Sequence, residues 1–178
     1  NKYLQFIQKT FNKDESLLDI GAGDGKFIEF VNTFSNYKLS AMEFSEKSSE
    51  FIKSIVGENN YYNTAVSKTN FNGKKFKIIT LWSVMEHLPN PLVELSKCKE
   101  ILDNDGIIIA QMPNFYSRAL KIFGIRNPTI NPRSHLQYFS YNSFLQIYPI
   151  CSIFWANTSL TSLVQSSCSL HVVSLANG

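Results

Sequence analysis

The stretch Ser16–Phe30, SLLDIGAGDGKFIEF, decides the fold class of this chain. Its apolar start, Ser16–Ile20, is typical of a short buried strand, and apolar residues return at helical spacing after the glycines. Between the two, Gly21, Gly23 and Gly25 allow a tight turn and leave room for a ligand against the main chain. Amide groups at the start of the helix would face that ligand. The stretch therefore predicts a strand, a ligand-binding turn and a helix.

Apolar runs and amphipathic segments keep alternating beyond this stretch. Strands that alternate with helices indicate βαβ units, so we expect an α/β fold with a doubly wound, mostly parallel sheet. The region after Met112 mixes aromatic residues, Pro and Arg, and predicts a helix and loop laid over the sheet. The predicted strands are Ser16–Ile20, Lys38–Met42, Tyr61–Val66, Phe76–Trp82 and Ile107–Met112. The predicted helices are 3–11, 25–34, 45–57 and 91–102, with a turn at 103–106 before the fifth strand.

The spacing of the glycines narrows the choice of ligand. A dinucleotide fingerprint, G-x-G-x-x-G, would need a glycine where Lys26 stands, and the Gly-Lys-Ser/Thr of a P-loop is missing. Glu43 ends the second predicted strand, where a carboxylate can accept both hydroxyls of a ribose. Asp19 adds a carboxylate that could orient the glycine loop or meet an ammonium group. The ligand is therefore expected to contain a ribose, with no need for a pyrophosphate.

Three stretches together resemble a known family. LLDIGAGDGKF, LSAMEFS and IITLWSVMEHLPNP resemble, in order and at ordinary spacing, the class I S-adenosylmethionine-dependent methyltransferases. The likeness is to the group that includes ubiquinone-pathway O-methyltransferases and many bacterial small-molecule methyltransferases. It covers about Leu17 to Ser140.

This resemblance implies a fold, a cofactor and a reaction. The implied sheet has seven strands in the order 3-2-1-4-5-7-6, and S-adenosylmethionine gives its methyl group to a small-molecule acceptor, most often on oxygen. The glycine loop would wrap the methionine part, Glu43 would hold the ribose hydroxyls, and Phe44 would lie against the adenine. The implied cofactor-binding residues are Asp19, Gly21, Ala22, Gly23, Glu43, Phe44, Ala65, Val66, Trp82 and Ser83.

The sequence also departs from this family's pattern. No Asp follows the third predicted strand to meet the adenine amino group, and Lys77 replaces the Asp of a common Phe-Asp pair. The ubiquinone-pathway enzymes carry Glu-x-x-Glu-His, a motif associated with a divalent metal. Here Ser83 replaces the first Glu, although Glu86 and His87 are kept. We therefore expect no metal.

Two histidines are candidate proton acceptors for a hydroxyl substrate. His87 follows the fourth strand, at the carboxyl edge where open α/β sheets bind ligands. His135 lies in HLQYFS, which resembles a segment that closes over the active site in this family. The alternatives are structural: Glu86 and His87 would cap the helix that starts near Pro89, and His135 would cap the next helix. His171 is assigned no role.

Composition excludes several classes of partner. The 178 residues fit one domain, and a formal charge of +3, with no basic stripe interleaved with aromatic residues, gives no sign of a nucleic-acid partner. Lys74, Lys75 and Lys77 form a short basic cluster, either a solvated loop or a phosphate-binding patch.

Three cysteines without CxxC spacing predict neither a zinc site nor a disulfide framework, and favour a cytoplasmic location. We expect no signal peptide and no membrane-spanning segment, and the missing initial Met indicates a fragment or trimmed domain.

The tail has an unusual composition. All 31 charged residues lie before Ser134. A buried terminal hairpin would explain this, and so would a frameshifted or chimeric end beyond Tyr148. We therefore assign 1–148 to the methyltransferase-like domain and 149–178 to an uncharged tail that either supplies its last strands or is aberrant.

Two other functions stay open at the level of sequence. A cofactor-binding or scaffold domain without turnover fits the missing Asp, the broken metal motif and the tail. A nicotinamide-dependent oxidoreductase is disfavoured by Lys26.

Overall fold

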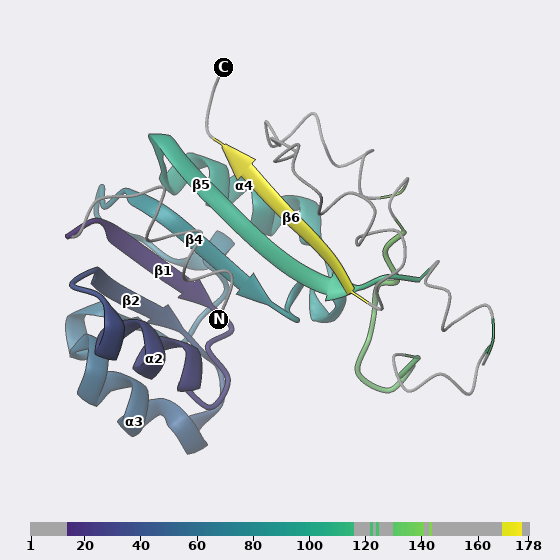
Figure 1. The fold of residues 1–178 in the computed structure, drawn as a ribbon, viewed down its shortest axis with the longest axis horizontal. Helices are drawn as coiled ribbons and strands as arrows, with labels where there is room; N and C mark the ends of the chain where they lie inside the picture. Colours follow the sequence, from purple (N-terminus) through teal and green to yellow (C-terminus); the bar gives the residue numbers. More distant parts are fainter. Residues whose placement is uncertain are drawn as a thin grey trace.

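The computed structural model describes residues 14–115, 122, 124, 130–140 and 143, and the backbone of residues 169–175. Its described strands form one sheet in the order β3-β2-β1-β4-β5-β6 (Figure 1). The first five run parallel, which confirms the predicted doubly wound α/β fold, and β6 is antiparallel to β5. The strands are β1 (Ser16–Ile20), β2 (Lys38–Met42), β3 (Tyr61–Tyr62), β4 (Phe76–Trp82), β5 (Leu102–Pro113) and β6 (Ser169–Leu175). The longer helices are α2 (Lys26–Phe34), α3 (Glu46–Val56) and α4 (Pro91–Ile101).

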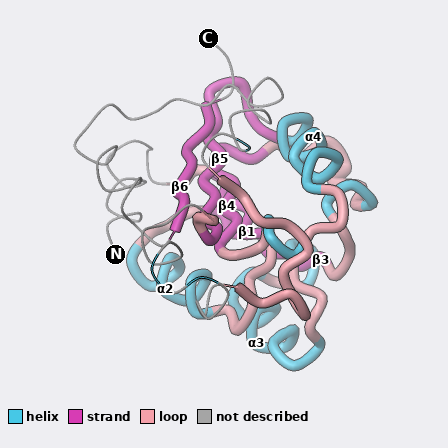
Figure 2. The backbone as a smooth tube through the Cα atoms, turned by 90° about the vertical axis from the view of Figure 1, so that its right-hand side faces the viewer, coloured by secondary structure: helices cyan, strands magenta, loops and turns pink. Residues whose placement is uncertain are grey.

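Helices cover both faces of the sheet, as Figures 1 and 2 show. Side chains along a strand point alternately to opposite faces, so Leu17 and Leu18 of β1 enter different cores. Leu17 packs in the core that α2 and α3 close, and Leu18 packs in the core that α4 closes. The helix residues buried in these cores are Ile28, Val31, Ile52, Val56, Leu95, Cys98 and Ile101.

The third strand is shorter than predicted. Only Tyr61 and Tyr62 pair with β2, and the chain then enters a 3-10 turn at Val66–Lys68. Val66 is 3% exposed and packs in the core that α4 closes. Its apolar side chain therefore holds the 3-10 turn against the core and does not extend the strand. The prediction of a strand over Tyr61–Val66 was wrong beyond Tyr62.

The predicted turn at 103–106 is part of β5. This strand begins at Leu102, and its register against β4 shifts between Phe76 and Ile78, which marks a bulge. A Cβ atom on Gly106 would lie 3.0 Å from the Lys77 carbonyl oxygen of β4, so the two strands meet closely there. The turn-forming residues 103–106 therefore form a bulge within β5 and not a turn before it.

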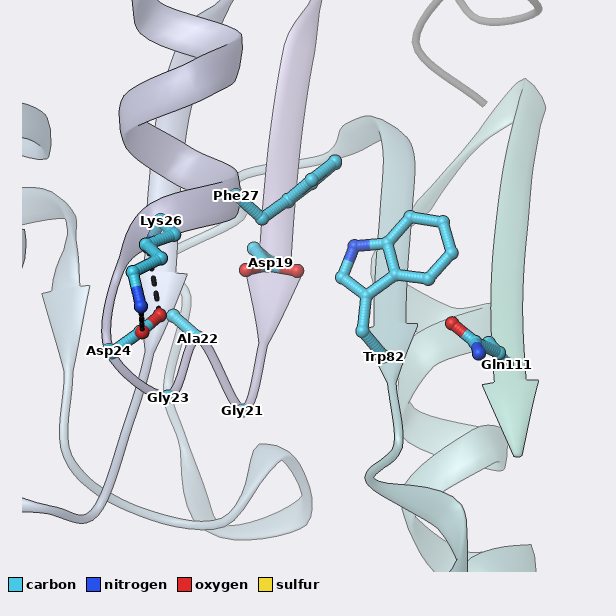
Figure 3. Close-up of a pocket in the computed structure, with 9 residues that line it drawn as sticks. All are labelled: Asp19, Gly21, Ala22, Gly23, Asp24, Lys26, Phe27, Trp82 and Gln111. Atoms are coloured by element: carbon cyan, nitrogen blue, oxygen red, sulfur yellow. Dashed lines mark hydrogen bonds and ion pairs between the residues drawn. The ribbon is translucent and has the colours of Figure 1, made fainter. Parts of the chain in front are cut away.

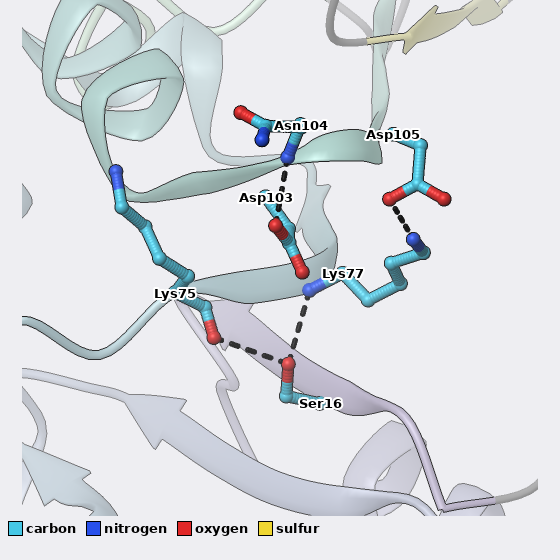
Figure 4. A network of polar contacts seen from close by, with 6 residues as sticks. All are labelled: Ser16, Lys75, Lys77, Asp103, Asn104 and Asp105. Atoms are coloured by element: carbon cyan, nitrogen blue, oxygen red, sulfur yellow. Dashed lines mark hydrogen bonds and ion pairs between the residues drawn. The ribbon is translucent and has the colours of Figure 1, made fainter.

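The lysine cluster stabilises the amino-terminal edge of the sheet (Figure 4). Lys77 Nζ pairs with Asp105, Lys75 Nζ donates to the Glu100 carbonyl, and Lys74 Nζ donates to Asn60 Oδ1 at 2.9 Å. Since each ammonium group has an acceptor within the chain, the structure favours neither a solvated loop nor a phosphate-binding patch.

Strand β6, Ser169–Leu175, is the part of the uncharged tail that the structure describes, and it joins the sheet. Its register against β5 runs from Ile107 opposite Leu175 to Pro113 opposite Ser169. It lies beside β5, where the resemblance implied the seventh strand. The division of the chain at residue 148 stays a prediction, and the predicted helix at 3–11 lies outside the described residues. Among the described residues, no helix is long and apolar enough to cross a membrane.

Candidate active site

The glycine turn between β1 and α2 is held by the neighbouring strand. Gly21 N and Ala22 N both donate to the Met42 carbonyl, at 2.8 and 2.9 Å. Gly21 has φ +70°, and a Cβ atom there would lie 2.5 Å from Val84 Cγ2. Only glycine therefore fits this position without displacing Val84. The turn brings its backbone close to the segment that follows β4.

Glu43 fixes the turn from the end of β2. Its Oε2 accepts from Gly23 N and its Oε1 from Ser45 N, both at 2.7 Å. Tyr61 Oη donates to the Glu43 carbonyl at 2.8 Å, which holds the main chain in place. A carboxylate oxygen can accept two hydrogen bonds, so each oxygen keeps capacity for a ligand hydroxyl. Glu43 is thus pre-oriented where the sequence places a ribose ligand.

Asp19 is a buried carboxyl group beside the turn. It lies opposite Thr80 in the β1–β4 register, and Thr80 Oγ1 donates to its Oδ1 at 2.6 Å. Burial, with the side chain 1% exposed, raises the pKa of Asp19 to about 7. The Thr80 hydrogen bond lowers this pKa and the charge of Glu43 raises it. A cationic ligand group nearby would favour the ionised form.

Replacing Asp19 with Asn is expected to flatten the pH dependence of stability. Because the pKa of folded Asp19 is raised from 3.8 to about 7, folded protein holds this proton where unfolded chain has lost it. The free energy of unfolding should therefore fall as pH rises between these values, by at most about 1.4 kcal/mol per pH unit. Urea unfolding across this range measures it. Asp14→Asn, at an exposed aspartate, is the control, and an unchanged slope in Asp19→Asn would contradict the expectation.

A cleft of about 430 Å³ opens between the turn and the ends of β4 and β5 (Figure 3). Figure 3 shows the glycine turn on one side and Trp82 and Gln111 on the other. Phe27 of α2 packs edge-on against Trp82, with ring centroids 5.1 Å apart. The lining residues are Asp19, Gly21, Ala22, Gly23, Asp24, Lys26, Phe27, Trp82 and Gln111.

The cleft unites about half of the residues expected to bind the cofactor. Glu43 and Phe44 lie outside its lining, and the Phe44 side chain is 67% exposed. The Val66 side chain is buried in the core that α4 closes. Ser83 has φ +53° and donates its N–H to the Gln111 carbonyl at 2.9 Å. Ala65 is half-buried, directly before the turn that buries Val66.

Sequence reasoning missed four lining residues: Asp24, Lys26, Phe27 and Gln111. Phe27 appears in the sequence only as part of the apolar face of α2. Gln111 could have been found from strand register, because it pairs with Trp82 at the carboxyl end of β5.

The two predicted histidines meet beyond the end of β4. Their ring centroids lie 5.0 Å apart, and His87 Nδ1 is 2.7 Å from the Ser134 carbonyl oxygen. The segment with His135 is held by Leu136 N and Gln137 N, which donate to the Glu86 carbonyl at 2.7 and 3.0 Å.

Helix capping does not explain Glu86 or His87. Asn90 is the N-cap of α4, and its side chain accepts from Val93 N. The Glu86 side chain is instead buried, 2% exposed, beside both imidazoles. Burial raises the pKa of its carboxyl group, and the two histidines oppose that shift. The predicted helix that His135 would cap lies outside the described residues.

Comparison with known proteins places the chain in a family. A family model described as a methyltransferase domain matches residues 1–148. The chain belongs to this family, and its 3-2-1-4-5 parallel sheet is that of a class I S-adenosylmethionine-dependent methyltransferase domain. The resemblance found in the sequence is confirmed, and membership of a methyltransferase family replaces the nicotinamide-dependent oxidoreductase alternative.

Two curated relatives are ubiquinone biosynthesis O-methyltransferases. The protein of Actinobacillus pleuropneumoniae serotype 5b is 26% identical over 131 residues, covering 67% of this chain and 54% of the relative. That of Haemophilus ducreyi is 27% identical over 118 residues, covering 61% and 48%. The chain thus spans about half the length of these relatives.

Solved structures support the fold. The plantazolicin methyltransferase BamL, in complex with a triazolic desmethylPZN analog and SAH, superposes with a TM-score of 0.72 at 17% identity over 99% of this chain and 82% of that one. A TehB-like SAM-dependent methyltransferase from Corynebacterium glutamicum gives 0.70 at 16% identity, over 97% and 86%. At these identities the likeness concerns the fold alone.

Proposed function

We propose that this domain transfers the methyl group of S-adenosylmethionine to a hydroxyl group of a small-molecule acceptor. The observation that carries the proposal is the meeting of two features at one sheet edge. One is the glycine turn fixed by Glu43, and the other is the pair His87 and His135. The cofactor is intrinsically reactive, so the protein's task is to align the acceptor oxygen with the methyl group and to exclude water.

The cofactor is assigned to the cleft beside the glycine turn. The loop Gly21–Gly23, with Ala22, lies against its methionine part, and Asp19 faces the ammonium group. Glu43 accepts the ribose hydroxyls, because both of its oxygens are already oriented by main-chain amides. Trp82 borders the methionyl side.

The remaining cofactor assignments follow from position along the sheet edge. Phe44 covers the adenine from its exposed position, and Ala65 with the main chain of Val66 borders the adenine edge. Ser83 follows Trp82 and contributes main-chain atoms to the methionyl side.

The acceptor is assigned to the side of the two imidazoles. A carbonyl oxygen can only accept, so His87 Nδ1 donates to Ser134 and Nε2 of the neutral ring carries the lone pair. The Tyr138 ring lies beside His135, with ring centroids 6.1 Å apart, and Phe115 packs on Tyr138 at 5.4 Å. Phe115 and Leu136 expose apolar side chains. A small acceptor with an apolar or aromatic body and a hydroxyl group suits this surface. The names of the curated relatives support transfer to oxygen.

Removing either imidazole is expected to reduce turnover without reducing cofactor affinity. His87→Gln and His135→Gln should each lower methyl transfer to a hydroxylated aromatic acceptor by about 10²- to 10⁴-fold, the range of general acid–base catalysis. Labelled S-adenosylmethionine and a panel of phenols and catechols measure transfer, and calorimetry with S-adenosylhomocysteine measures affinity.

Glu100→Gln, at an exposed position of α4, is the matched control and should keep the wild-type rate. Wild-type turnover in both histidine variants would refute their role. Transfer only to nitrogen or carbon acceptors would refute O-methylation.

A further inference from the structure

We propose that Ser48, in the first turn of α3, is a positioning residue of the cofactor site. Its Oγ donates a hydrogen bond to the Gly23 carbonyl at 2.5 Å, across 25 residues of the chain. Ser48 is not among the residues that line the cleft, so it acts on the cofactor through Gly23, which is. This inference rests on the proposed function, because it assumes that the glycine turn holds S-adenosylmethionine.

Gly23 is the glycine of the turn that packing restrains least. It has φ +58°, and a Cβ atom built there would have only the Gly21 carbonyl oxygen within 4 Å among the described residues. Gly21 differs, because a Cβ atom there would lie 2.5 Å from Val84 Cγ2. Gly25 differs too, since Ile52 Cγ1 would lie 3.0 Å from its Cβ atom. Glycine has wide conformational freedom, so the exposed Gly23 depends on hydrogen bonds to keep one conformation.

Two side chains from outside the turn hold the peptide groups on either side of Gly23. Glu43 Oε2 accepts from Gly23 N at 2.7 Å, and Ser48 Oγ donates to the Gly23 carbonyl. Each bond fixes the direction of one peptide plane, so the first restrains φ and the second restrains ψ. Glu43 Oε1 also accepts from Ser45 N, at the N-cap of α3. The tip of the turn is therefore tied both to the end of β2 and to the first turn of α3.

Loss of the Ser48 hydroxyl group would release one of these two restraints. The peptide group between Gly23 and Asp24 could then rotate about ψ, and both residues line the cleft. Water can replace the hydroxyl group at the Gly23 carbonyl, but a water molecule does not fix the direction of the peptide plane. A ligand that needs one conformation of the turn must then order this residue on binding, and ordering a residue of the main chain costs free energy.

Ser48→Ala is therefore expected to weaken S-adenosylhomocysteine binding by about 3- to 10-fold. This range corresponds to the net contribution of one hydrogen bond. The variant should fold, because alanine favours a helix and Ser48 is only half-buried. Calorimetry measures the affinity, and urea unfolding measures the stability of each protein.

Ser49→Ala is the matched control. Ser49 is the next residue of α3, is half-buried like Ser48, and donates its hydroxyl group to the Glu46 carbonyl of its own helix at 2.9 Å. This variant loses a serine hydroxyl group beside Ser48 but no bond to the glycine turn, so it should bind as the wild type does. Ser48→Thr keeps the hydroxyl group and should restore the affinity that Ser48→Ala loses.

Hydrogen exchange in the ligand-free chain separates positioning of the turn from a general effect on stability. In Ser48→Ala, peptides that contain residues 21–26 should exchange faster than in the wild type, because the turn opens locally. Peptides from β4 should exchange at the wild-type rate. Faster exchange in both regions, or unchanged exchange in the turn, would overturn the inference.

The binding experiment keeps this inference distinguishable from the proposed function. Equal S-adenosylhomocysteine affinity in the wild type and in Ser48→Ala would overturn the inference and leave the cofactor cleft standing. An equal loss of affinity in Ser49→Ala would also overturn it, because the effect would then belong to the whole first turn of α3. A wild-type chain that binds no S-adenosylhomocysteine would refute the proposed function itself, and the role of Ser48 with it.

Discussion

Replacing Glu43 with Gln should weaken S-adenosylhomocysteine binding by about 100-fold or more. The two Glu43 oxygens each accept a main-chain N–H, from Gly23 and from Ser45. A Gln side chain has a single acceptor oxygen, so its NH₂ group would oppose one of these donors. The variant thus loses both the orientation of the turn and one acceptor for the ribose hydroxyls. Hydrogen bonds to charged groups contribute about 1.5–3 kcal/mol each, so losing one or two gives this range.

Calorimetry with Glu46→Gln as the matched control separates this effect from a general loss of charge. Glu46 is an exposed glutamate at the start of α3, three residues after Glu43. Its variant should bind as the wild type does. A Glu43→Gln protein that is folded by circular dichroism and binds with wild-type affinity would remove Glu43 from the cofactor site.

Gly21→Ala is expected to abolish measurable methyl transfer and to destabilise the fold. Two terms add: a left-handed φ costs a residue with a Cβ about 1–2 kcal/mol, and overpacking against Val84 costs about 1–3 kcal/mol. The new Cβ would lie 2.5 Å from Val84 Cγ2 but 3.6 Å from Val84 Cβ. Either the turn or Val84 must therefore shift, and the turn is the wall of the cleft.

Two further variants separate strain from collision. Gly73 has φ +77°, and a Cβ atom added there would have nothing within 4 Å. Gly73→Ala should therefore lose only the stability that the left-handed φ costs. Adding Val84→Ala to Gly21→Ala removes the Cγ2 atom, and the double variant should recover part of the lost stability through a favourable coupling of about 1–2 kcal/mol. Urea unfolding measures five proteins: the wild type, the two glycine variants, Val84→Ala alone and the double variant. If Gly21→Ala and Gly73→Ala lose the same free energy of unfolding, and Val84→Ala shows no coupling to Gly21→Ala, then the contact of the new Cβ atom with Val84 does not destabilise the fold.

The central sheet followed from sequence because its determinants are local. The apolar runs at β1, β2 and β4 end where the structure ends these strands, and Gly57 directly follows the end of α3. The errors lie where tertiary contacts override local pattern. Val66 is apolar because it anchors a 3-10 turn in the core, and the residues 103–106 form a bulge because β5 already pairs with β4 at Leu102.

The candidate site divides in the same way. Asp19 and Glu43 could be chosen from their positions at strand ends, since parallel strands present their carboxyl ends at one edge. The resemblance brought His87 and His135 to the active site, but the position of Glu86 beside both imidazoles was not predicted, because it needs the segment 130–140 to return to the end of β4. No local pattern fixes that return. The pairing of Trp82 with Gln111 depends on the register of two strands in the same way.

Calorimetric titration of the purified chain with S-adenosylhomocysteine tests the central claim most directly. The expected result is a single site of micromolar affinity, with no binding of NADH by the same protein. A folded protein that binds no S-adenosylhomocysteine would contradict the assignment of the glycine turn, and with it the methyltransferase function proposed for this chain.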